Sequence, residues 1–169
     1  MSDAFGRIVA IIASVFVLFF LPMIIVTQKM DNTAQAYIDN AVVEFVDNAR
    51  ATGVVSPQSY EKMCREIDTI QSNCLIEIRH SSRQAVSDGT EIEIQYYDYF
   101  KDDILAVMYP PAGANQKYKM KNGDFISVTV YNKTPTLGTR LYRMIMPLYN
   151  PSGVTIYSTY SGFVGNNPE

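Results

Sequence analysis

The sequence predicts an α+β protein with a long N-terminal helix, a short second helix, and then an antiparallel sheet of about four strands. Three observations lead to this fold class. Residues 8–26 form an uncharged apolar run, IVAIIASVFVLFFLPMIIV, interrupted only by Ser14 and Pro22. Residues 27–52 are more polar but keep apolar side chains at helical spacing. Beyond residue 74 the apolar period changes from 3.6 to 2, which is typical of strands.

The apolar run is long enough to cross a bilayer, since a helix rises about 1.5 Å per residue and the hydrocarbon core is about 30 Å thick. We therefore expect a membrane-spanning helix over residues 8–26, with residues 1–7 as a short leader or cytoplasmic end. A cleavable secretory signal is the alternative, because residues 34–36 (Ala-Gln-Ala) have the form of a cleavage site. Cutting there would destroy the amphipathic stripe that follows the run, so we expect the helix to be retained.

The helix should continue as an amphipathic segment over residues 27–52, giving one helix of about 45 residues and on the order of 70 Å. No proline or glycine interrupts this segment before Gly53, which we expect to end it. The side chains expected to pack along the two halves are Ile8, Ile12, Val15, Phe19, Pro22, Met30, Ala34, Ile38, Ala41, Val42, Phe45 and Ala49.

Residues 53–169 are enough for one α+β head with its own core. Ser56 and Pro57 supply an N-cap residue and a proline at the first helical position, so a second helix should run to about residue 71. Its apolar side chains recur at steps of three and four, which places one side against the core; they are Tyr60, Met63, Ile67 and Ile70.

Strands are expected over residues 74–82, from residue 92 onward, over 125–131 and over 154–162. In the first, the side chains that share one face are Cys74, Ile76, Ile78 and His80, and in the third they are Ile126, Val128 and Val130. Residues 97–109 are ambiguous, and residues 139–149 fit a short helix or an irregular edge.

The two cysteines, Cys64 and Cys74, stand in the second helix and at the start of the first strand. In an oxidising compartment they would form a disulfide worth about 2–3 kcal/mol. Two unrelated buried thiols are the alternative. Two thiols and the single histidine, His80, do not complete a zinc site by themselves.

The formal charge is −3, and lysine and arginine are scattered singly, which argues against nucleic acid as a partner. No nucleophile elbow, phosphate-binding loop or dinucleotide fingerprint occurs, so we expect neither an enzyme nor a cofactor. The acidic cluster of Asp98, Asp102 and Asp103, near Asp124, could attract calcium, but the spacing matches no ordered calcium loop and favours a solvated acidic edge. We expect His80 to be an ordinary hydrogen-bonded histidine.

A hydrophobic N-terminal helix that continues as the spine of a small α+β head resembles the type IV pilin-like proteins, and most closely the TadE-like minor pilins and pseudopilins of tight-adherence systems. The resemblance rests on residues 5–51 and on the strand sequence GDFISVTV at residues 123–130. Small side chains are spaced along the polar half of the helix at Ala34, Ala36, Ala41, Ala49 and Ala51. The resemblance implies an extracytoplasmic head and helices that bundle into a filament core or short pseudopilus.

It also implies processing near the N-terminus, where Gly6 would precede the cut and Arg7 would become the first residue. The chain departs from the usual pattern, because no acidic residue lies between Asp3 and Asp31. This departure suggests a non-standard subunit, at a filament tip or left uncleaved. Pro22 either opens the helix for filament assembly or is a tolerated membrane proline.

The sequence therefore predicts a single-pass membrane protein that assembles with itself or with other pilin-like subunits at the cell surface or in a filament. The alternative is a signal-anchored ligand-binding or adhesion module that forms no filament. That module would use a cleft in its sheet to bind a small ligand.

Overall fold

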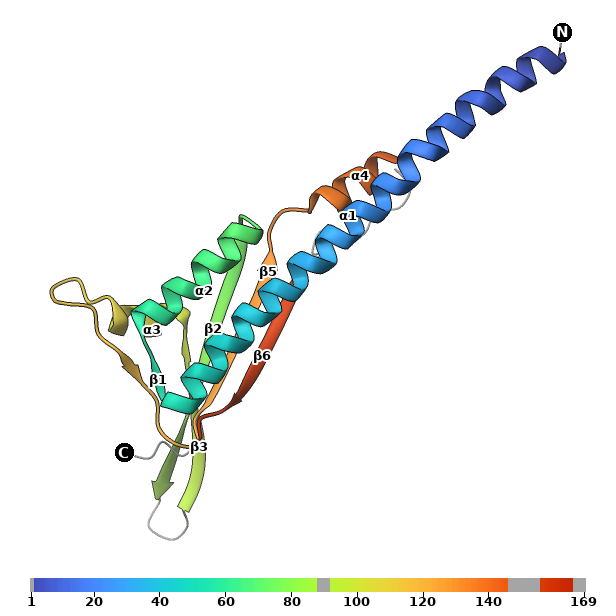
Figure 1. Cartoon of the computed structure of the whole chain (residues 1–169). Coiled ribbons are helices and arrows are strands. Elements are labelled where there is room, and N and C mark those ends of the chain that lie inside the picture. The colour runs from blue at the N-terminus through green and yellow to red at the C-terminus, as the bar shows by residue number, and fades with distance from the viewer. Residues whose placement is uncertain (1, 88–91, 146–155, 166–169) are drawn as a thin grey trace.

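The computed structural model describes residues 2–87, 92–145 and 156–165, and it confirms the α+β class (Figure 1). The helices are α1 (Ser2–Thr52), α2 (Pro57–Ile70), α3 (Lys101–Met108) and α4 (Leu137–Ile145). The strands are β1 (Val54–Val55), β2 (Cys74–Ser87), β3 (Ile92–Phe100), β4 (Tyr118–Lys119), β5 (Phe125–Asn132) and β6 (Tyr157–Phe163).

Helix α1 is a single helix of 51 residues that continues through Pro22. It is longer than expected because it includes nearly all of the segment predicted as a leader. Its end is confirmed at Gly53, whose φ of 66° lies in the left-handed region that glycine adopts without steric cost. The N-terminal half of α1 extends away from the head, while its C-terminal half lies over the sheet (Figure 1).

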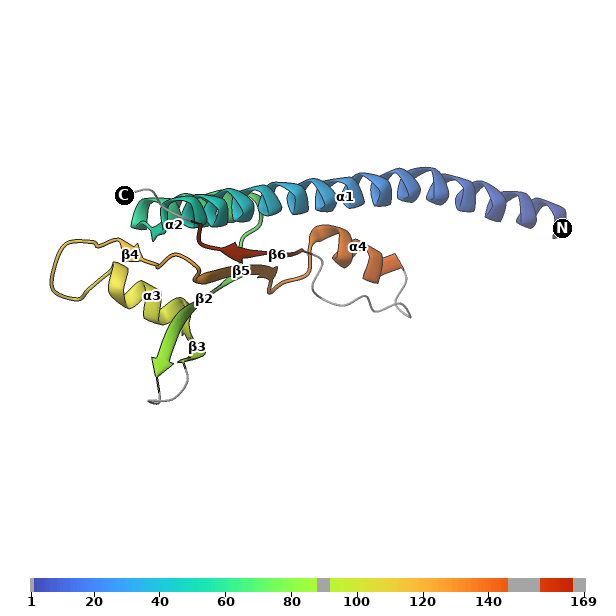
Figure 2. The ribbon, with the colours of Figure 1, turned by 90° about the horizontal axis from the view of Figure 1, so that it is seen from below.

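The main sheet is antiparallel with strand order β3-β2-β5-β6, and β1 pairs with β4 in a separate two-stranded sheet. Strand β2 pairs with β5 from Cys74 opposite Asn132 to Ser81 opposite Phe125. Helices α1 and α2 lie on the same face of the main sheet (Figure 2). The predicted strand face is confirmed, since Ile126, Val128 and Val130 of β5 are all fully buried; Ile78 of β2 is buried beside them.

The core lies between this sheet face and the C-terminal half of α1. Its fully buried members on α1 are Ile38, Val42 and Val46, and α2 adds Met63 and Ile67. Burying each such side chain contributes about 1.5–3 kcal/mol, so the C-terminal half of α1 is part of the folded head and not merely its stalk.

The start of α2 is confirmed by a capping box. The Ser56 hydroxyl accepts the Ser59 N–H at 3.1 Å, and Pro57 occupies the first turn. A cap of this kind contributes about 1 kcal/mol. The helix ends at Ile70, one residue before the predicted end.

Strand β2 is longer than predicted because two partners specify it. It pairs with β5 only as far as Ser81, whereas β3 continues alongside it to Ser87 opposite Ile92. The β2–β3 hairpin therefore projects beyond the rest of the sheet (Figure 1).

The ambiguous region, residues 97–109, contains the end of a strand and a helix. β3 ends at Phe100 and α3 follows at once, burying Ile104 and Met108. Asp103 accepts the backbone N–H of Phe100 at 2.9 Å, which favours the change from strand to helix.

The region that fitted a short helix or an irregular edge contains α4, which begins two residues before residue 139. The last strand, β6, runs from Tyr157 to Phe163, and residues 154 and 155 of its predicted range lie outside the described residues.

Candidate functional site

The surface of α1 divides at about residue 34. In the N-terminal half, the predicted packing residues are all exposed: Ile8 57%, Ile12 64%, Val15 51% and Phe19 75%. The segment is long and apolar enough to cross a membrane, and none of its apolar window is buried in the structure. The apolar side chains of this N-terminal segment are therefore exposed to the surroundings of the protein and do not pack on the head.

In the C-terminal half, the predicted stripe packs against the protein's own sheet. Ile38 and Val42 are fully buried, and Ala41, Phe45 and Ala49 are 7% exposed or less. These small and apolar residues are consequently occupied within one chain and are not free to meet a second one.

Met30 is an exception, since it is 60% exposed and the prediction that it packs with the stripe is wrong. The sheet reaches α1 only from Gln35, whose side-chain amide donates to the Tyr157 carbonyl at 2.9 Å and accepts the Tyr157 N–H at 3.0 Å. Met30 instead lines a groove of about 770 Å³ between α1, the end of α2 and the segment leading into α4. Tyr37, 60% exposed, lines the same groove.

Gly6, Arg7 and Pro22 all lie on exposed positions of α1. No atom of another element lies within 4 Å of a Cβ built at Gly6. The expected processing at this glycine stays a prediction.

The predicted disulfide is wrong for this structure, in which Cys64 and Cys74 are both free thiols. The Cys74 thiol turns back to its own tight turn and donates to the Gln71 carbonyl at 3.4 Å. Burial raises the pKa of both cysteines, and in Cys64 a hydrogen bond with Tyr60 opposes part of that rise. Both thiols are therefore kept protonated and weakly reactive at neutral pH.

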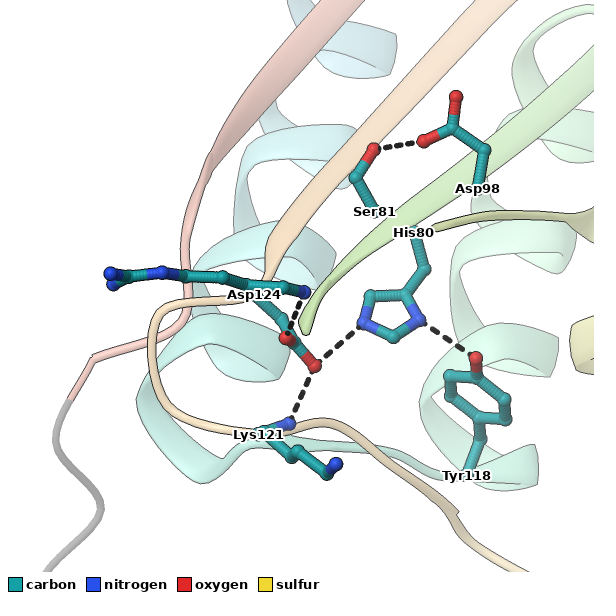
Figure 3. Close-up of polar contacts among 7 residues, drawn as sticks. His80, Ser81, Asp98, Tyr118, Lys121 and Asp124 are labelled. Carbon is teal, nitrogen blue, oxygen red and sulfur yellow. Dashed lines mark hydrogen bonds and ion pairs between the residues drawn. The ribbon is translucent and has the colours of Figure 1, made fainter. Parts of the chain in front are cut away.

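The main buried polar cluster is centred on His80 of β2, only 3% exposed (Figure 3). Its Nε2 lies 2.9 Å from Oδ2 of Asp124, and its Nδ1 lies 2.8 Å from the hydroxyl of Tyr118. The ring also stacks on Tyr99 of β3, with centroids 5.7 Å apart. The expected hydrogen-bonded histidine is confirmed.

Asp124 is the centre of the hydrogen bonding in this cluster. It accepts the backbone N–H of Lys121 at 2.7 Å and that of Arg83 at 3.0 Å, in addition to its contact with His80. Burial alone would raise the pKa of this carboxyl, but the two N–H groups and His80 together hold it below its usual range. Asp124 is thus ionised at neutral pH and accepts a hydrogen bond from His80 Nε2.

Tyr118 completes the cluster on β4. Burial, with smaller effects from Tyr99 and Asp124, raises the pKa of Tyr118 to about 12, so its hydroxyl stays protonated at the position where it hydrogen-bonds with Nδ1 of His80. Asp124 is 1% exposed and Tyr118 8% exposed. Since these groups scarcely meet solvent, the arrangement serves to join β2, β4 and the turn before β5.

The remaining acidic residues are accounted for locally. Asp98 accepts a hydrogen bond from the Ser81 hydroxyl, and Asp102 and Asp103 occupy the first turn of α3. Among the described residues, no group of three or more histidine, cysteine, aspartate or glutamate side chains could hold a metal.

The sheet also has a hollow of about 680 Å³, lined in part by Leu75, Glu77 and Arg79 of β2, together with Phe100 and Asp102. Glu77 accepts a hydrogen bond from the Tyr131 hydroxyl at 3.0 Å. The hollow has both charge signs and an exposed aromatic ring at its edge, which are features that a polar ligand could use.

Sequence reasoning did not identify Tyr118 or Asp124 as partners of His80. The signal was weak, because Asp124 stands in an ordinary Asn-Gly-Asp turn and Tyr118 is one of twelve tyrosines. Comparison with known proteins adds no further assignment, since no family model, curated protein or solved structure matches this chain.

Proposed function

We propose that the protein is a pilin-like structural subunit, anchored by α1 in a membrane, that assembles with other copies or with related subunits. The observation that carries this proposal is the continuity of α1. One helix runs from an apolar segment with no buried residue directly into the core of the head, with no linker between them.

This continuity has a mechanical consequence. Because Ile38, Val42 and Phe45 are buried in the head, the direction of the membrane segment is fixed relative to the sheet. Contacts between membrane segments would therefore set the arrangement of neighbouring heads. A simple anchor requires no such rigid connection.

The membrane half also has a surface suited to helix contact. Gly6, Ala10 and Ser14 are exposed and recur every fourth residue, so they lie on one side of α1. Small side chains at this spacing allow helices to approach closely in lipid. The Ser14 hydroxyl donates to the Ile11 carbonyl at 2.8 Å, so it adds no unpaired donor to this surface. We call Gly6, Ala10 and Ser14 the small-residue face.

In this proposal the head lies on the extracytoplasmic side. The charges beside the apolar run do not set the orientation, because Arg7 is the one basic residue before it and Lys29 the first after it. The support comes from the pilin-like resemblance, in which the head faces outward and the helices form the core of the assembly.

The test is whether native protein can be sheared from cells without detergent and recovered as assemblies. A double change of the small-residue face, Gly6→Leu with Ala10→Leu, should reduce the sheared fraction while the head stays folded. Val15→Leu, on the other side of the same helix, is the matched control and should assemble normally. The proposal fails if wild-type protein is found only as a monomer in the membrane fraction.

An anchored ligand-binding module is the second candidate, and the hollow beside Arg79 and Phe100 favours it. It predicts that one compound raises the melting temperature of the head with saturable dependence. Arg79→Ala should abolish that shift, whereas the assembly proposal expects no effect of Arg79→Ala on the sheared fraction.

A further inference from the structure

Helix α4 is fixed to α1 close to the end of the apolar run. The Thr136 hydroxyl, just before α4, donates to Asp31 Oδ2 at 2.8 Å. A Cβ on Gly138 would lie 2.6 Å from the same oxygen and 3.4 Å from Thr27 Cβ. The two helices therefore approach as closely as they do because residue 138 is glycine.

From this contact α4 runs alongside α1 toward the N-terminal end of α1, as both views show (Figures 1 and 2). Each helix rises about 1.5 Å per residue, so Met144 lies about 9 Å beyond Gly138. That distance corresponds to about six residues of α1 and brings Met144 level with about residue 23. The end of α4 is thus beside the apolar run of residues 8–26 and not beside the polar half of α1.

The side chains of α4 suit a position beside the apolar run of α1. Met144 is 82% exposed, the highest exposure among the large apolar side chains that the structure describes. Arg140 is exposed and Arg143 is half-buried, and the helix contains no acidic residue. An apolar side chain turned outward, together with basic side chains nearer the head, matches the change from acyl chains to phosphates at a bilayer surface.

We propose that α4 lies in the head-side surface of the bilayer, with Met144 among the acyl chains and Arg140 near the lipid phosphates. This proposal rests on α1 spanning the membrane, but it does not require assembly into a filament. It gives the head a second membrane contact beside α1, which fixes its rotation as well as its distance from the lipid.

The experiment uses the absence of tryptophan from the chain. In the full chain, Met144→Trp places one tryptophan at the proposed contact, where a highly exposed side chain leaves room for it. Phe19→Trp, at a 75% exposed position opposite the small-residue face, marks the bilayer interior, and Tyr157→Trp, at a 57% exposed position on β6, marks the head. Each variant is reconstituted in phosphatidylcholine vesicles with and without brominated acyl chains, which quench nearby tryptophan.

We expect Met144→Trp to lose emission in brominated vesicles nearly as strongly as Phe19→Trp, while Tyr157→Trp keeps its emission. The proposal is overturned if Met144→Trp is as unquenched as Tyr157→Trp while Phe19→Trp is quenched. Unquenched Met144→Trp emission that shifts to the blue with protein concentration would overturn it in favour of a second copy covering α4. If Phe19→Trp is also unquenched, α1 itself is outside the bilayer, and the anchoring fails together with this proposal.

The charge contribution is tested separately. With anionic phosphatidylserine added to the vesicles, Arg140→Glu in the Met144→Trp chain should lower the quenching. In vesicles of phosphatidylcholine alone, the same change should have a smaller effect, because the surface charge is absent. Equal effects in both lipids would overturn the role given to Arg140.

Discussion

The two halves of α1 share one backbone and both contain valine and phenylalanine, yet their surroundings differ completely. Val15 and Phe19 are 51% and 75% exposed, whereas Val42 and Phe45 are 0% and 4% exposed. The second half contains charged residues on its outer side, and the first half has none between Arg7 and Lys29. An apolar stripe on a polar helix packs on a sheet, while a helix that is apolar all round requires lipid or other helices.

We therefore expect substitution of the same residue type to have different effects in the two halves. A change in the C-terminal half should alter the stability of the head. The matched change in the N-terminal half should leave the head folded and alter only insertion or assembly.

Val42→Asp should have the largest effect on stability. It places a carboxylate at a fully buried position that provides no partner for the charge. This should lower the free energy of unfolding by more than about 4 kcal/mol. Val15→Asp should leave that free energy unchanged and disfavour membrane insertion by about 2.5–3.5 kcal/mol at most. Urea denaturation of the detergent-solubilised chain, followed by the near-ultraviolet circular dichroism of its tyrosines, measures the first effect.

Phe45→Ala should have the next largest effect. It should lower the free energy of unfolding by about 3–5 kcal/mol, because a buried ring is removed and a cavity is left in its place. Phe19→Ala, which removes the same ring from an exposed position, is the control. Equal stability losses in the two variants would show that the halves of α1 are not distinct.

Asp124→Asn should destabilise the head by about 1–3 kcal/mol at neutral pH, because the backbone N–H groups of Lys121 and Arg83 lose a charged acceptor. The folded pKa of Asp124 lies below its unfolded value, so its contribution is present above about pH 4 and is lost as the pH falls further. Melting temperatures from pH 7 down to pH 2 should therefore fall less steeply in Asp124→Asn than in the wild type.

Thr136→Val should give the smallest loss, about 1–2 kcal/mol. It removes the hydroxyl that accepts the Thr139 N–H at 3.2 Å at the start of α4 and the hydrogen bond to Asp31. Thr159→Val, at an exposed position on β6, should change the free energy of unfolding much less. A similar loss in both would mean that α4 does not depend on this contact.

The sequence predicted best those elements whose signal is local. The run before Val26, the glycine that ends α1, the Ser56 cap and the alternation in β5 each depend on neighbours in the chain, and all four are found in the structure.

Features that depend on distant residues were missed or wrong. Met30 fits the helical stripe by spacing, but the sheet does not extend far enough to cover it. The extra length of β2 comes from its pairing with β3, and the bond between His80 and Asp124 joins residues 44 positions apart. The cysteine pair was misjudged because Cys74 turns toward Gln71, and spacing along the chain does not reveal side-chain direction.

The most direct test of the account is a disulfide cross-linking scan of α1 in native membranes, in a chain carrying Cys64→Ala and Cys74→Ala. A cysteine at Ala10 or Ser14 should form disulfide-linked dimers on mild oxidation, because helices meeting at the small-residue face bring their Cα atoms within about 7 Å. A cysteine at Thr159 should form few, although it is exposed. If Ala10, Ser14 and the opposite positions Ile12 and Phe19 all stay monomeric like Thr159, the membrane half of α1 does not meet another copy, and the proposed self-assembly through α1 is contradicted.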